Sequence, residues 1–197
     1  MPDTELLVRL RALLPGAQDF AWSSERQSGE PGRAAAVLMP IQQQADGLHL
    51  LLTRRTDHLH HHPGQISLPG GRIDAGDADA RSAALRECEE EIGLRAAQVE
   101  LLGQLPDYGT WSGFHVTPFV GLVSADYVPK LDSFEVAELF SVPLAFLLDQ
   151  GNYQHHRVER DNARRHFFAV PWQGRFIWGV TAGMLAMLSA FVARNGR

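Results

Sequence analysis

Apolar residues recur at helical spacing in three parts of the chain. Leucines spaced three and four residues apart in residues 4–14 predict a short amphipathic helix. The second half of residues 70–94 has an apolar face next to a face that carries three glutamates, which predicts a second helix. Residues 181–193 are almost wholly apolar but shorter than the roughly 20 residues that a bilayer span needs, so we expect a core helix.

Local signals mark the ends of these helices. Asp77 precedes the glutamate-bearing helix and is expected to cap its first turn. Gly93 follows the same helix, where a left-handed residue is usually needed. Thr181 is expected to cap the C-terminal helix. We expect the N-terminal helix to dock on its own domain, with contact to a membrane as the alternative.

Short apolar runs separated by polar turns predict strands. Residues 33–40 and 48–53 flank a turn around Asp46 and Gly47, so we expect a hairpin of buried strands. Further strands are predicted at residues 99–105, at residues 113–123 and, in two or three pieces, across residues 153–179.

Composition indicates a single domain. The chain has 197 residues, of which 45% are hydrophobic and 21% charged. We expect a domain over residues 33–193, preceded over residues 1–32 by the helix and by a polar loop that begins at residue 21.

A net charge of −5 makes a general nucleic-acid surface a poor expectation. With Cys88 as its single cysteine, expected to be buried, and no signal-peptide pattern at its start, the sequence indicates a cytoplasmic protein.

Residues 86–94, RECEEEIGL, resemble the second half of the Nudix box. That box runs glycine, five residues, glutamate, seven residues, then Arg-Glu-apolar-x-Glu-Glu-x-Gly-apolar, and every defined position of this segment fits it. The first half departs from the pattern. Ala78 stands where the box has glutamate, Gly71 lies one residue too far away, and Asp77 is a candidate substitute for the missing carboxylate.

The resemblance implies an α/β (α+β) fold, the Nudix-type αβα sandwich with a mixed central sheet. It also implies metal-dependent hydrolysis of a nucleoside diphosphate linked to another moiety. Carboxylates on one helical face suit a hard divalent cation, Mg²⁺ with Mn²⁺ as the alternative, and we assign Glu87, Glu90 and Glu91 as its ligands. Arg86 is expected to hold these side chains in place. One of them, Glu90 in our assignment, or else Glu138, is the expected general base.

Residues 51–71, LLTRRTDHLHHHPGQISLPGG, resemble the signature of the coenzyme A pyrophosphatase subfamily. That signature runs Leu-Leu-Thr-x-Arg-Ser/Ala, three residues, Arg, three residues, Gly, three residues, Phe-Pro-Gly-Gly. This sequence departs from it at Thr56, His60 and Leu68. The change at His60 matters most, because it replaces a permanent cation with a group that is mostly neutral near pH 7. The subfamily pattern also recurs downstream in SGFHVTP and FEVAELFSVP.

The subfamily resemblance implies coenzyme A, or one of its derivatives, as a small-molecule substrate, cleaved to 3′,5′-ADP and 4′-phosphopantetheine. Planar arginine side chains bind anionic groups well, because they donate two parallel hydrogen bonds. The expected substrate-binding residues are Arg54, Arg55, His60, Gly70 and Gly71.

Three alternatives remain open at this stage. The histidine run at residues 58–62 could hold zinc, but consecutive residues do not suit zinc geometry, so we expect a structural or substrate-facing role. The substrate could be another dinucleotide such as NADH or ADP-ribose. The domain could instead bind nucleotides without catalysis, a hypothesis motivated by Ala78.

Overall fold

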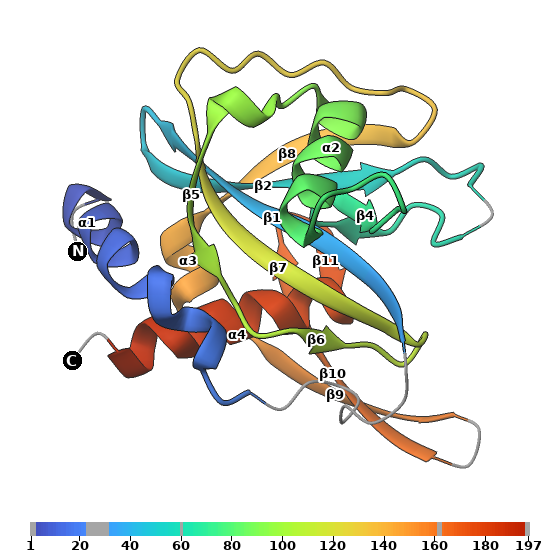
Figure 1. Cartoon of the computed structure of the whole chain (residues 1–197). Helices are drawn as coiled ribbons and strands as arrows, with labels where there is room; N and C mark the ends of the chain where they lie inside the picture. Colours follow the sequence, from blue (N-terminus) through green and yellow to red (C-terminus); the bar gives the residue numbers. More distant parts are fainter. Residues whose placement is uncertain (1–2, 23–31, 60, 161–162, 196–197) are drawn as a thin grey trace.

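A mixed β-sheet runs through the centre of the molecule (Figure 1). The computed structural model describes residues 3–22, 32–59, 61–160 and 163–195. The strands of the central sheet are β1 (Arg33–Gln44), β2 (Gly47–Arg55), β3 (Ile66–Ser67), β4 (Gly70–Arg72), β5 (Val99–Gln104), β6 (Tyr108–Gly109), β7 (Phe114–Val123) and β8 (Val136–Pro143). Their order is β3-β2-β1-β7-β5, with β4, β6 and β8 paired to β1, β7 and β2. The β1–β7 pair is parallel and the other pairs are antiparallel, so the predicted mixed sheet is confirmed.

The predicted hairpin and the strands after the glutamate-bearing helix are also confirmed. β1 and β2 are longer than the apolar runs that indicated them, and they pair from Gln44 opposite Gly47 to Ile41 opposite Leu50. Three strands occupy the region in which two or three were expected: β9 (Gln154–Arg160), β10 (Ala163–Trp172) and β11 (Arg175–Trp178). They form a second antiparallel sheet in the order β11-β10-β9.

Helices cover both faces of the central sheet, as the predicted αβα sandwich requires (Figure 1). The helix α2 (Ala80–Ile92) packs on one face, with the buried Cys88 and Ile92 against Leu38 and Leu51. The helices on the other face are α1 (Asp3–Leu13), η1 (Leu14–Asp19), α3 (Leu144–Leu148) and α4 (Val180–Asn195). Two short 3₁₀ turns, η2 (Ala96–Gln98) and η3 (Gln150–Asn152), complete the described elements.

The N-terminal helix docks on its own domain. Leu6, Leu10 and Leu14 are buried in the same core cluster as residues of α4, and Arg9 donates a hydrogen bond to the carbonyl of Val192 at 3.0 Å. Most of the loop that we predicted from residue 21 onward lies outside the described residues.

The start of α2 differs from the prediction, because Asp79 and not Asp77 caps it. The Asp79 carboxylate accepts the backbone N–H of Ser82 at 2.7 Å, and the Ser82 hydroxyl oxygen accepts the Asp79 N–H at 2.9 Å. This reciprocal capping box satisfies donors that the first turn leaves free. At the other end Gly93 has a φ of 72°, so the predicted left-handed C-terminal residue is confirmed.

The C-terminal helix α4 is buried along most of its length, which confirms the predicted core helix. The prediction that Thr181 caps it is wrong. Thr181 lies within the first turn, and its hydroxyl donates a hydrogen bond to the carbonyl of Ile66 at 3.1 Å. This bond ties the start of α4 to β3. No helix among the described residues is both long and apolar enough to cross a bilayer.

Candidate active site

Arg86 connects most of the charged groups at the outer side of α2. Its Nε and Nη2 donate to the two oxygens of Asp77 at 2.9 and 3.0 Å, a bidentate pair. Its Nη1 donates to Glu87 at 3.1 Å and to Glu90 at 3.0 Å. The bond to Arg86 holds the pKa of Asp77 below its ordinary value. Asp77 therefore supplies a carboxylate partner for Arg86 on the loop where the Nudix box pattern has its first glutamate.

Glu87 and Glu91 lie one turn apart and turn inward, toward the strand β4. Glu91 is 4% exposed and accepts the backbone N–H of Gly70 at 3.2 Å. A Cβ added at Gly71 would lie 2.4 Å from the carboxyl carbon of Glu87, so the glycine leaves the space that this carboxylate fills. Burial raises the pKa of Glu91 to about 8 and raises that of Glu87 above its ordinary value.

The carboxylates around α2 form an oxygen-only donor set, which suits a hard divalent cation. Burial and, to a smaller extent, repulsion from nearby carboxylates raise the pKa of Glu87 and Glu91, which means that both make the ionised form less favourable. A bound cation would stabilise the ionised form of both side chains. Glu90 differs from the other two, because its side chain is 58% exposed; like Glu87, it contacts Arg86. No three Asp, Glu, His or Cys side chains in the described part of the chain form a ready-made metal-binding group.

Arg55 and Glu135 border the same carboxylates from the sheet. The Nη1 of Arg55 lies 3.7 Å from Glu91, and its Nη2 lies 3.5 Å from Glu135. The negative charge of Glu135 also acts on Glu87 and Glu91. Arg55 therefore lies within ion-pair distance of two acidic side chains.

Arg54 and Glu138 form a separate group. Glu138 contacts Arg175 of β11, and Arg54 lies 3.8 Å from Glu138 and 3.3 Å from Asp57. None of these contacts reaches the glutamates of α2. The structure thus brings Arg55, Gly70 and Gly71 together with Glu87 and Glu91, but it does not bring Arg54 or Glu138 there. His60 lies outside the described residues.

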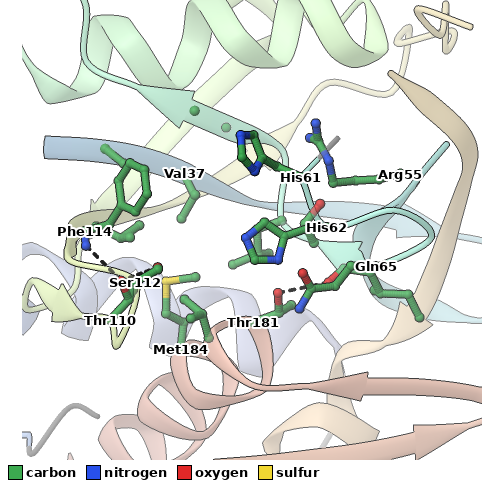
Figure 2. A pocket seen from close by; sticks show the side chains of 18 of the residues that line it. Val37, Arg55, His61, His62, Gln65, Thr110, Ser112, Phe114, Thr181 and Met184 are labelled. Carbon is green, nitrogen blue, oxygen red and sulfur yellow. Dashed lines mark hydrogen bonds between the residues drawn. The ribbon is translucent and has the colours of Figure 1, made fainter. Parts of the chain in front are cut away.

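A cavity of about 340 Å³ opens beside the strand β4. Gly70, Gly71 and Arg55 belong to its wall, so the cavity reaches the backbone that touches Glu91 and Glu87. Figure 2 shows Phe114, Thr110 and Ser112 on one side and His62, Gln65 and Arg55 on the other. The apolar part of the wall comes from Val37, Ile66, Leu68, Phe114, Val116, Val180 and Met184. The combination of apolar walls and a few polar groups is typical of a small-molecule site.

Several residues of this wall were not predicted from the sequence as site residues. Thr110, Ser112, Phe114 and Met184 come from the loop before β7, from β7 itself and from α4. The SGFHVTP segment was a signal for two of them, because it holds Ser112 and Phe114. No local sequence pattern indicated Met184, which reaches the cavity only through the packing of α4.

Comparison with known proteins identifies the class. The family profile described as the NUDIX domain matches residues 31–161. The chain is 38% identical over 190 residues to the uncharacterized Nudix hydrolase NudL of Yersinia pestis (strain Pestoides F), covering 96% of this chain and 94% of that protein. It is equally similar to NudL of Yersinia pseudotuberculosis (serotype O:1b, strain IP 31758). The chain therefore belongs to the Nudix family, whose hydrolases generally use divalent metal ions.

Solved structures agree on the fold. A Nudix hydrolase from M. smegmatis, RenU, superposes with a TM-score of 0.56 at 20% identity, covering 83% of this chain and 87% of that one. The MutT protein of Methanosarcina mazei Go1 gives a TM-score of 0.54 at 18% identity, covering 87% of this chain and 100% of that one. At these identities the likeness concerns the fold alone.

Proposed function

We propose that this Nudix protein hydrolyses the diphosphate of coenzyme A, or of one of its derivatives, to 3′,5′-ADP and 4′-phosphopantetheine. The observation that carries the proposal is the position of the signature segment. Four of its matched or near-matched positions, Arg55, Leu68, Gly70 and Gly71, line the cavity. Gly70 and Gly71 also touch the two inward glutamates. The segment that resembles the subfamily therefore lies between the cavity and the acidic helix.

The acidic helix supplies the groups that this reaction needs. We assign Glu87, Glu90 and Glu91 as ligands of Mg²⁺, with Mn²⁺ as the alternative, and Arg86 as the residue that orients Glu87 and Glu90. A bound divalent cation would offset charge on the diphosphate oxygens and lower the pKa of an attacking water.

We assign the general base to a carboxylate close to this helix. We assign Glu90 as the base because its side chain is the most exposed of the three glutamates and so the most accessible to water. The contacts of Glu138 with Arg54 and Arg175 do not reach the glutamates of α2, so Glu135, whose charge acts on Glu87 and Glu91, replaces it as the alternative base.

The test is to incubate the purified protein with coenzyme A and Mg²⁺, with Mn²⁺ in parallel, and to detect 3′,5′-ADP by mass spectrometry. We expect product that depends on the metal, and a loss of turnover of about tenfold to a hundredfold in Glu91→Gln, because the variant removes a proposed metal ligand. A circular dichroism melt of the variant checks that its fold survives. Turnover of NADH or ADP-ribose with no turnover of coenzyme A would refute the substrate assignment. No turnover of any of these substrates would favour a nucleotide-binding domain without catalysis.

A further inference from the structure

Most arginines near the cavity are already paired with carboxylates. Arg54 and Arg55 each contact two acidic side chains, and Arg86 contacts several. Arg33 and Arg72 are different. Both side chains are exposed, and neither forms an ion pair with any carboxylate of the described residues. No carboxylate among the described residues therefore offsets the positive charge of these two guanidinium groups.

Strand register brings the two unpaired arginines to one ring. Arg33 of β1 pairs in parallel with Phe114 of β7, and Arg72 of β4 pairs with Ala35 of β1. Since residues i and i+2 of a strand share a face, Arg33, Arg72 and Phe114 all project from the cavity side of the sheet. The guanidinium carbons of Arg33 and Arg72 lie 4.1 and 5.7 Å from the centre of the Phe114 ring.

Contact with the ring orients the guanidinium groups and leaves hydrogen-bond donors free. Nη2 of Arg33 donates to the carbonyl of Ser112 at 3.2 Å. A guanidinium has five N–H donors, so each arginine retains donors for an acceptor, and two such groups suit a phosphate that carries two negative charges. Phe114 and Arg72 line the cavity, so an anion bound here lies at its rim.

This rim is separate from the place where the diphosphate is expected. Gly71 faces Glu87 and α2, whereas its neighbour Arg72 points to the opposite face of the sheet, as consecutive strand residues do. A phosphate held by Arg33 and Arg72 is therefore a different group from the one that faces the α2 glutamates.

We propose that Arg33, Arg72 and Phe114 form a subsite for a phosphate monoester on the adenosine part of the substrate. The proposal rests on the proposed function, under which this group is the 3′-phosphate of coenzyme A. The two arginines then supply permanent positive charge that the subfamily signature places at position 60, where this chain has histidine.

The experiment is calorimetric titration of the full chain with Mg²⁺, using two ligands that differ only in the 3′-phosphate, 3′,5′-ADP and 5′-AMP. The unmodified protein is expected to bind 3′,5′-ADP at least about tenfold more tightly, because charge-assisted bidentate bonds are strong. Arg33→Gln and Arg72→Gln each weaken 3′,5′-ADP binding by about tenfold and leave 5′-AMP binding unchanged. Arg11→Gln is the matched control, since it removes an equal charge from an exposed pair with Glu100 remote from the cavity.

Three results would overturn the subsite: equal affinity of the unmodified protein for the two ligands, no measurable binding of 3′,5′-ADP, or equal weakening of both ligands by the arginine variants. Melting curves of the variants show whether they are folded. The binding assay does not depend on turnover, so the subsite and the activity fail separately. Selective binding of 3′,5′-ADP without cleavage of coenzyme A would support the subsite and refute the proposed reaction.

Discussion

At the scale of single residues, Gly71 controls the space available to a proposed metal ligand. A methyl group at this position would lie 2.4 Å from the carboxyl carbon of Glu87 and would displace that carboxylate. We expect Gly71→Ala to lower kcat by about a hundredfold, because misplacement of a catalytic group by about 1 Å has an effect of this size. Steady-state kinetics with coenzyme A measure the change.

Gly76→Ala is the matched control for this prediction. A Cβ at Gly76 would meet no atom within 4 Å, and the residue lies in the loop between β4 and α2. The variant is expected to keep full activity. A Gly71→Ala enzyme as active as the unmodified protein would show that Glu87 has no required position.

Arg86 gives a second prediction at this scale. Its planar fork bonds Asp77, Glu87 and Glu90 at once, and a lysine ammonium cannot reproduce that geometry. We expect Arg86→Lys to raise the Mg²⁺ concentration for half-maximal activity by about tenfold or more, as loss of a group that orients metal ligands does. Arg81→Lys, an exposed change on the same helix, is the control. An unchanged Mg²⁺ requirement in Arg86→Lys would contradict the positioning role.

The neighbouring residues Arg54 and Arg55 have different partners, which the sequence did not predict. Arg54 and Arg55 are adjacent and chemically identical, and we expected both to bind substrate, although only Arg55 occupies a defined position of the signature. Their partners are set by pairing with β8, which shifts register between the two arginines: Arg54 contacts Glu138, and Arg55 contacts Glu91 and Glu135. Local motifs predicted the helix glutamates because they share one helix, whereas partners distant in sequence required the fold.

At the scale of elements, the helix α2 was predicted from its apolar spacing and its final glycine, and its first residue was not. Two aspartates, Asp77 and Asp79, precede the helix, and both are candidate caps by type. The signal that separates them is Ser82, three residues after Asp79, which completes the capping box. Asp77 is thereby left available for Arg86.

The cap leads to a stability prediction. Hydrogen bonds from Ser82 hold the pKa of Asp79 below its ordinary value, so the charged cap is favoured in the folded state. Asp79→Ala is expected to lower Tm near pH 7 by about 2–4 °C. Asp79→Asn keeps a good cap, so its Tm is expected to stay close to that of the unmodified protein.

The pH dependence of this effect follows from the direction of the shift. A lowered folded pKa contributes stability above the unfolded pKa, and that contribution is lost as pH falls through the folded value. The Tm difference between Asp79→Ala and the unmodified protein is therefore expected to shrink below about pH 4, near the ordinary aspartate pKa. Melting curves from pH 7 to pH 3 test this, and a constant difference would exclude an ionised cap.

At the scale of the whole molecule, the site depends on the two faces of the central sheet, because one face packs against α2 and the other borders the cavity. One face of β1 packs Ala36 and Leu38 under α2, and the other face, which also carries Arg33, places Ala35 and Val37 in the cavity wall. The sequence resemblance predicted the sandwich, and the apolar spacing predicted its acidic helix. It could not predict the cavity, whose wall combines β1, β4, β7 and α4 from parts of the chain that only tertiary packing joins.

The N-terminal helix α1 packs into the hydrophobic core, although it lies before the predicted domain boundary at residue 32. Leu10 is fully buried among core residues, whereas Val8 on the same helix is 61% exposed. Leu10→Ala is expected to lower the free energy of unfolding by about 2–5 kcal/mol, because it opens a cavity in the core. Val8→Ala is the matched control and is expected to change it by less than about 0.5 kcal/mol. Urea unfolding curves measure both variants. A small effect in Leu10→Ala would mean that the helix α1 is only loosely attached to the domain, whereas the full loss would make it an integral part of the domain core that carries the site.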